Sequence, residues 1–307
     1  MDKKKVIKYV IITYVIAWAL QIAGALYMVN NPGMTGQMVF KGSMAVCMFG
    51  PFVAALLVKA DFRSMGWKPK FKGNIGWLFF CAYASTIPTV LGAALFYGIF
   101  PNLLDTSGSY LIAQTEAMGV DIEEQLAQAG LTMQTYMLTS LAACIYAPFL
   151  NIITAIGEEV GWRGFLYPEL NKSFGKIGTW LIGGTIWGAF HFPSIIFGGY
   201  EYGFDYLGKP VLGLIAFTIT CIALGVLEEI VYSRTKSIWY AALMHGSVNC
   251  ISTLPLMLLN VNDPAAEKYM ILGPYMNGLI AGIPLVICAV IMGAAAIRKQ
   301  KAKEVSV

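Results

Sequence analysis

The chain is organised around one charged stretch, Gly157-Glu158-Glu159-Val160-Gly161-Trp162-Arg163. It places two adjacent carboxylates and a guanidinium at the end of a long apolar run. An ionisable group at membrane depth loses hydration at a cost of at least ~2.5 kcal/mol, which makes it a candidate for function. Glu159 and Arg163 are four residues apart and share one helix face, whereas Glu158 is rotated by about 100° and faces elsewhere. The stretch alone leaves open a surface ion pair at a helix end.

The composition around this stretch is that of a polytopic membrane protein. The chain has 307 residues, of which 57% are hydrophobic and 12% charged, and its mean hydropathy is +0.65. Soluble domains carry roughly 25% charged residues. The six cysteines are scattered through apolar segments and lack the close pairing of zinc ribbons or redox motifs. The net charge of +4 indicates membrane orientation rather than nucleic-acid binding.

Apolar runs predict an all-α fold with eight transmembrane helices, since each run reaches the roughly 20 residues that a bilayer requires. The predicted spans are about 7–29, 44–60, 75–100, a fourth from about 136, 177–197, 211–232, 238–258 and 270–297. Neither an internal repeat nor a domain linker interrupts them, which favours a single transmembrane domain, 1–307. The missing repeat also argues against a secondary transporter, because those folds are commonly duplicated.

Charge distribution predicts the orientation of these helices. With eight crossings, all Lys and Arg residues except Lys41, Lys209 and Lys268 fall on or near the side of the N-terminus. This asymmetry predicts that both termini are cytoplasmic. Residues 101–135 contain acidic residues but no Lys or Arg, as expected for a non-cytoplasmic loop, and 121–128 is predicted to form a short surface helix.

Two histidines, His191 and His245, are the only ones in the chain, and both fall inside predicted membrane helices. Trp187 precedes His191 by one helical turn, and Asn249 follows His245 by one turn, so each pair shares a helix face. A lone histidine on an apolar helix more often makes an interhelical hydrogen bond. Two histidines, an asparagine and an unpaired glutamate on three helices instead favour a shared site.

Such a set contains the groups that amide hydrolysis needs: a base for water, a group that holds the water, and donors for the oxyanion. Glu158 is the candidate base, His191 would position the water, and His245 with Asn249 would donate to the oxyanion. The alternative is a zinc ion held by Glu158, His191 and His245, although the contiguous His-Glu-x-x-His helix of zinc proteases is absent.

A second acidic pair, Glu228-Glu229, lies near the end of the sixth predicted helix. Its nearest arginine, Arg234, is five residues after Glu229 and so is off the i+4 position. We interpret this pair as a cytoplasmic helix end or a minor support. Gly184-x-x-x-Gly188 is a general close-packing motif of membrane helices.

These motifs together resemble the CPBP or Abi intramembrane proteases, a family that includes type II CAAX prenyl endopeptidases and bacteriocin-processing and self-immunity proteins. The resemblance covers about 148–255 and rests on three boxes: Glu158-Glu159-x-x-x-Arg163, Trp187-x-x-x-His191 and His245-x-x-x-Asn249. Phenylalanine is usual in the family where this chain has Trp187.

The resemblance implies an eight-helix fold with a conical cavity open to the bilayer and the cytosol. It also implies that Glu158 and His191 activate water and that His245 and Asn249 form the oxyanion hole, with Glu159 and Arg163 as structural support. We expect Trp187 to be a further structural support. Both metalloprotease and metal-free mechanisms have been argued for the family. We expect the metal-free form, since a buried Asn249 one turn from His245 suits oxyanion donation better than metal ligation.

Helix lengths impose one further condition. Hydropathy puts Glu158 near the cytoplasmic end of the fourth helix, whereas His191 lies about 14 residues, or ~21 Å, into the fifth. The two side chains meet only if the fourth helix continues through Arg163 to about Glu169. We therefore predict a fourth helix that is longer than its apolar run and bent near Pro148.

The leading hypothesis from the sequence is an intramembrane endopeptidase in a bacterial cell membrane that acts on a membrane-associated or lipidated peptide. Peptide processing or bacteriocin immunity is favoured over cleavage of prenylated CAAX proteins. Two other classes stay open: a proton-coupled transporter with a Glu and His relay, and a non-catalytic immunity or scaffold protein with the same fold. Oligomeric state, cleavage site and metal use are not indicated.

Overall fold

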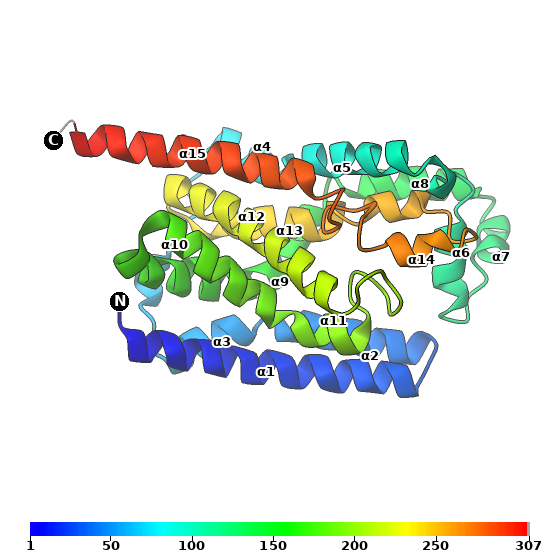
Figure 1. Ribbon diagram of the computed structural model, residues 1–307, viewed down its shortest axis with the longest axis horizontal. Coiled ribbons are helices and arrows are strands. Elements are labelled where there is room, and N and C mark those ends of the chain that lie inside the picture. Colours follow the sequence, from blue (N-terminus) through cyan, green and yellow to red (C-terminus); the bar gives the residue numbers. More distant parts are fainter. Residues whose placement is uncertain (306–307) are drawn as a thin grey trace.

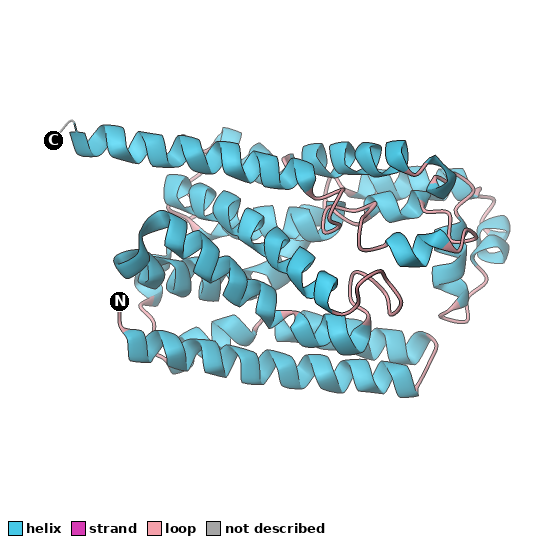
Figure 2. Cartoon of the chain, viewed as in Figure 1, coloured by secondary structure: helices cyan, strands magenta, loops and turns pink. Residues whose placement is uncertain are grey.

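The computed structural model describes residues 1–305, with side chains through residue 302; residues 306–307 of the predicted single domain lie outside it. Within the described residues every regular element is a helix, apart from one isolated bridge between Leu104 and Leu259 (Figure 2). The predicted all-α fold class is confirmed.

Most of the chain forms apolar helices that lie roughly along one axis (Figure 1). These are α1 Lys3–Asn30, α2 Met34–Cys47, α3 Gly50–Leu57, α4 Ile75–Tyr83, α5 Thr86–Ile99, α8 Met133–Ala143, α9 Ala147–Gly161, α10 Tyr167–Phe190, α11 Phe192–Gly198, α12 Val211–Thr235, α13 Ile238–Ile251 and α15 Ile283–Val305. The remaining elements are α6 Ser109–Glu116, α7 Ile122–Gln128, α14 Ala265–Tyr269, the 3-10 turns η1 Phe62–Met65, η2 Pro101–Leu103 and η4 Leu254–Leu258, and the π-helix η3 Trp162–Leu166.

Seven helical stretches in the described chain are long and apolar enough to cross a membrane, and the protein is a multi-pass membrane protein. One stretch, Ala147–Gly198, has 52 residues, or ~78 Å of helix, more than twice the ~30 Å hydrocarbon core. Non-helical backbone at Gly175 (φ 61°, ψ −173°) divides it. The helix α1 begins and α15 ends at the same end of the molecule (Figure 1), as an even number of crossings requires. The count of eight and the cytoplasmic side stay predictions.

The fourth predicted helix continues beyond its apolar run, as expected. The chain stays helical from α9 through η3, which contains Arg163, and into α10. Near Pro148 the chain is broken rather than bent, because turn residues 144–146 separate α8 from α9. Pro148 lies in the first turn of α9, where its missing N–H leaves no helical hydrogen bond unmade.

The eighth predicted span, 270–297, is wrong in its first half, because α15 begins only at Ile283. The preceding segment contains Gly273-Pro274, Gly278 and Gly282, which break helical structure. Its backbone is satisfied locally instead: the amide of Leu279 donates to the carbonyl of Ile271 at 2.8 Å.

The acidic segment 101–135 lies at the opposite end of the bundle from the start of α1 (Figure 1). The predicted surface helix is confirmed as α7, with Asp121 as its N-cap. Burial raises the pKa of the nearby Asp105, but hydrogen bonds from Ser109 and Ser107 outweigh burial and lower this pKa to about 2. These bonds fix the entry to α6.

Close packing of α10 on α12 brings α12, which carries Glu228 and Glu229, to the centre of the bundle. A Cβ atom at Gly184 would lie 2.5 Å from the Cα of Ile222, and one at Gly188 would lie 2.8 Å from the Cα of Thr218. Real Cβ atoms are not found at such distances, so only glycine permits this approach. The sequence interpretation of the Gly184-x-x-x-Gly188 motif is confirmed.

Candidate active site

The candidate site is built from the C-terminal part of α9, the π-helix η3, the end of α10 and the middle of α13. Glu158, Glu159, Arg163, His191 and His245 are all buried. A π-helix turn widens the helix locally and is frequent at functional sites. Here it begins at Trp162, three residues after Glu159, and carries Arg163.

Glu158 is held by two indole groups. The Nε1–H groups of Trp162 and Trp187 donate to its Oε2 at 2.9 and 2.7 Å, and the residue is 1% exposed. Both indoles therefore donate to the same oxygen, whereas Oε1 accepts no hydrogen bond from the described residues. Sequence reasoning did not identify Trp162, although its i+4 spacing from Glu158 was a usable signal.

Glu159 and Arg163 form the predicted i+4 ion pair, with Oε1 and Nη1 2.8 Å apart. The second partner of Arg163 is Glu228 of α12, whose Oε2 lies 2.5 Å from Nη2, and all three side chains are fully buried. The interpretation of Glu228 as a cytoplasmic helix end is therefore wrong, and its contact with Arg163 matches the other interpretation, that of a minor support. Its neighbour Glu229 faces away, toward Lys176 at 3.7 Å. Spacing along α12 does not reveal this because the arginine lies on another helix.

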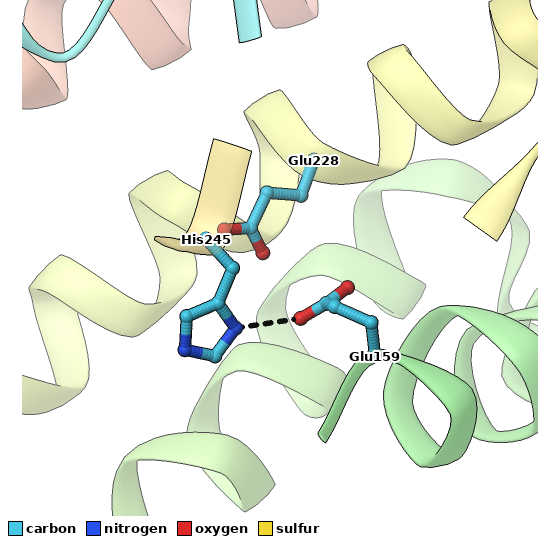
Figure 3. A group of neighbouring side chains, drawn as sticks. All are labelled: Glu159, Glu228 and His245. Atoms are coloured by element: carbon cyan, nitrogen blue, oxygen red, sulfur yellow. Dashed lines mark hydrogen bonds and ion pairs between the residues drawn. The ribbon is translucent and has the colours of Figure 1, made fainter. Parts of the chain in front are cut away.

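Each of the two imidazoles faces a hydrogen-bond acceptor with its Nδ1 atom. Nδ1 of His191 lies 3.1 Å from the carbonyl oxygen of Trp187, and Nδ1 of His245 lies 2.9 Å from Oε1 of Glu159 (Figure 3). Both partners are acceptors, so both Nδ1 atoms carry a proton. The Nε2 atoms of His191 and His245 remain for chemistry.

Trp187 connects the two histidines to the glutamate. Its indole N–H binds Glu158 and its backbone carbonyl binds His191. The centroid of its ring lies 5.3 Å from that of His245, and the guanidinium of Arg163 lies 4.5 Å from the ring. Its predicted supporting role is thus a specific one, because the indole N–H makes a bond that phenylalanine lacks.

Asn249 departs from the expectation. It was expected to be buried one turn from His245, but it is exposed. Its Nδ2 donates to Oδ1 of Asn151 in α9 at 3.1 Å, which orients the carboxamide and leaves its second N–H free to donate elsewhere. Asn151 was not identified from the sequence.

A cavity of about 280 Å³ brings His191, His245 and Asn249 together in one wall with Trp187. Glu158 does not line this cavity and contacts its lining through Trp187, whose indole N–H donates to Oε2 of Glu158. Glu201, on the loop before α12, also lines the cavity. Burial raises the pKa of Glu201, although hydrogen bonds with neighbouring polar side chains partly offset this effect.

The predicted zinc ligands do not form a compact set. Among the described side chains, the group whose candidate ligand atoms all lie within 4.8 Å of one another is Glu159, Glu228 and His245, drawn in Figure 3, rather than Glu158, His191 and His245. Both carboxylates of the compact group already bind Arg163. A metal there would have to displace a buried guanidinium, so these residues do not fit a resident metal.

Comparison with known proteins finds a family match for the segment that contains these residues. Residues 139–251 match the family described as type II CAAX prenyl endopeptidase Rce1-like. The predicted resemblance to the CPBP family is confirmed over this segment, which is little more than a third of the chain. The matched segment runs from α8 to the end of α13 and contains every candidate catalytic residue.

One curated relative of this chain is "CAAX prenyl protease 2" from Methanococcus maripaludis. The two sequences are 26% identical over 102 residues, which is 33% of this chain and 37% of the relative. The match therefore spans little more than a third of the relative's length.

Proposed function

We propose that this protein is an intramembrane endopeptidase that hydrolyses a peptide bond of a membrane-associated, lipidated substrate. The observation that carries the proposal is the convergence of Glu158, His191 and His245 on Trp187, next to a cavity that His191 and His245 line. The family match over residues 139–251 supports hydrolysis as the reaction class.

Glu158 is the general base in this proposal. The indoles of Trp162 and Trp187 replace water as donors to Oε2 and hold the carboxylate in one orientation. Oε1 then accepts a proton from the attacking water and later returns it to the leaving amine. His191 complements this role, because Nε2 of a ring protonated at Nδ1 accepts a hydrogen bond and orients the same water.

His245 is the main oxyanion donor. Because Nδ1–H is bound to Glu159, Nε2 donates only when the ring is a cation. Charge balance supports that state: Arg163 neutralises only one of the two buried carboxylates, Glu159 and Glu228. A protonated His245 neutralises the second, since an unpaired buried charge is costly. The second N–H of Asn249 adds a weaker, more solvated donor.

The substrate is inferred from chemistry and similarity together. The matched family and the relative are both named for CAAX prenyl processing. The cavity lies among membrane helices, where a lipid anchor would deliver a peptide. We propose a prenylated, CAAX-type peptide as the first substrate to test.

The test uses full-length protein in liposomes and two fluorogenic peptides that differ only in a farnesyl group. We expect cleavage of the lipidated peptide, and a loss of at least a thousandfold in kcat for Glu158→Gln. The matched control is Glu229→Gln, which changes a glutamate outside the site. Equal cleavage by Glu158→Gln and wild type would refute the assignment. Ion flux that Glu158→Gln abolishes, without any cleavage, would favour a transporter instead.

A further inference from the structure

A second site lies on the far side of α12 from the buried charges. The helices α10 and α15 flank α12 (Figure 1), and an apolar cavity of about 420 Å³ runs between them. Its floor includes the buried Ala223 and Val226 of α12, while Leu181 and Val290 on its walls are 51% and 64% exposed. The cavity is therefore a groove that opens toward lipid.

The groove has the length of one leaflet. Its lining residues on α15 extend from Val286 to Ile297, a helical rise of ~16 Å. Half of a ~30 Å hydrocarbon core is ~15 Å. A single acyl chain from one leaflet thus matches the groove in length and in polarity.

A basic cavity of about 370 Å³ adjoins one end of the groove. Consecutive residues join the two. On α10, Ile177 lines the groove and Lys176 lines the basic cavity, and on α15, Ile297 lines the groove and Ala296 lines the basic cavity. The cations that line the basic cavity are Lys176, Arg234, Lys236 and Lys299, and its wall contains no carboxylate.

Most of this positive charge is uncompensated. Lys176 has Glu229 at 3.7 Å, but Arg234, Lys236 and Lys299 have no carboxylate within 4.0 Å among the side chains that the structure describes. The cavity is lined by residues from the C-terminal parts of α12 and α15, among them Arg234 and Lys299. The helix α15 ends at the end of the bundle where α1 begins (Figure 1), which the charge distribution predicts to be cytoplasmic. That leaflet carries the anionic lipids of a cell membrane.

We propose that the groove and the basic cavity together bind one anionic phospholipid, with its phosphate at Arg234, Lys236 and Lys299 and one acyl chain between α10 and α15. Basic pockets between membrane helices on the cytoplasmic side suit such headgroups. An apolar groove alone would accept any lipid, and a basic cavity alone would accept any anion. Their continuity selects a molecule with both parts.

Native mass spectrometry of the full-length protein in detergent tests this site with phosphatidylglycerol and phosphatidylcholine of the same acyl chains. We expect one phosphatidylglycerol molecule to bind at least about tenfold more tightly than phosphatidylcholine. Lys299→Gln should weaken binding about fivefold, as expected for ~1 kcal/mol per basic residue. The matched control Arg298→Gln, an exposed neighbour outside both cavities, should bind as the wild type does.

A second pair of variants tests the groove. Ala294 lines it and Ala295 does not, and both are exposed. Ala294→Phe should weaken phosphatidylglycerol binding severalfold, whereas Ala295→Phe should not. Equal binding of both lipids, equal effects within either pair of variants, or equally tight binding of inorganic phosphate would overturn the proposal. Neither pair touches the candidate active site, so loss of lipid binding and loss of peptide cleavage are separable.

Discussion

The hydrogen bond from Trp187 to Glu158 provides the sharpest test of the site. Trp187→Phe keeps the aromatic ring but removes an N–H that lies 2.7 Å from Oε2. A hydrogen bond to a charged group contributes about 1.5–3 kcal/mol. Trp162 still donates to the same oxygen, so kcat should fall by about tenfold to a hundredfold. KM should change little, because the bond acts on the base and not on the bound peptide.

Steady-state cleavage of the lipidated fluorogenic peptide in liposomes measures both constants. The control is Trp239→Phe. It also removes an indole N–H whose hydrogen bond is 2.7 Å long, but this bond is made to the carbonyl of Trp67, away from the cavity. It should leave kcat within about twofold of the wild-type value.

Two outcomes would contradict this reasoning. If Trp187→Phe retains wild-type kcat while Glu158→Gln is inactive, the indole does not hold the base. If Trp187→Phe and Trp239→Phe lower kcat equally, the loss reflects general packing. Phenylalanine is the usual family residue at this position, so the measurement also shows whether this chain has come to depend on its tryptophan.

Four further outcomes are expected. Arg163→Met should destabilise the protein by about 3–5 kcal/mol in chemical denaturation, because it leaves buried carboxylates unpaired, and adding Glu228→Leu should recover part of that loss. Gly184→Leu should cost about 1–3 kcal/mol by forcing α10 from α12, whereas Gly98→Leu, with open space around it, should not. Hydrogen bonds lower the folded-state pKa of Asp105 from 3.8 to about 2. The charged Asp105 should therefore stabilise the fold fully above about pH 4, and this contribution should be lost as the pH falls to about 2. Asp105→Asn should remove about 1 kcal/mol of stability after discounting for solvent screening, measurable as the unfolding temperature against pH. A zinc chelator should leave peptide cleavage unchanged; loss that added Zn²⁺ restores would contradict the metal-free interpretation.

Local pattern accounts for much of the site. The i+4 spacing of Glu159 and Arg163 predicted their ion pair, and the helical spacing of Trp187 and His191 predicted their shared face. The continuation of the fourth helix through Arg163 followed from the requirement that Glu158 and His191 meet. Each of these relations is set by the geometry of one helix, which the sequence encodes directly.

Relations between helices required the tertiary structure. Nothing in the spacing of α12 reveals that Glu228 lies against Arg163, and nothing in α13 reveals that Asn249 is exposed beside Asn151. Hydropathy also overextended the last helix, because the segment before Ile283 is apolar and buried without being helical.

The amino-acid sequence by itself determined the membrane class, the helical fold and the candidate catalytic residues, since composition and helical periodicity depend only on neighbours along the chain. Only the tertiary structure decided which carboxylate lies outside the ion pairs of Arg163, which two carboxylates share Arg163, and which indoles hold Glu158. Those assignments depend on contacts between side chains far apart in the sequence, and close packing of the helices selects among them.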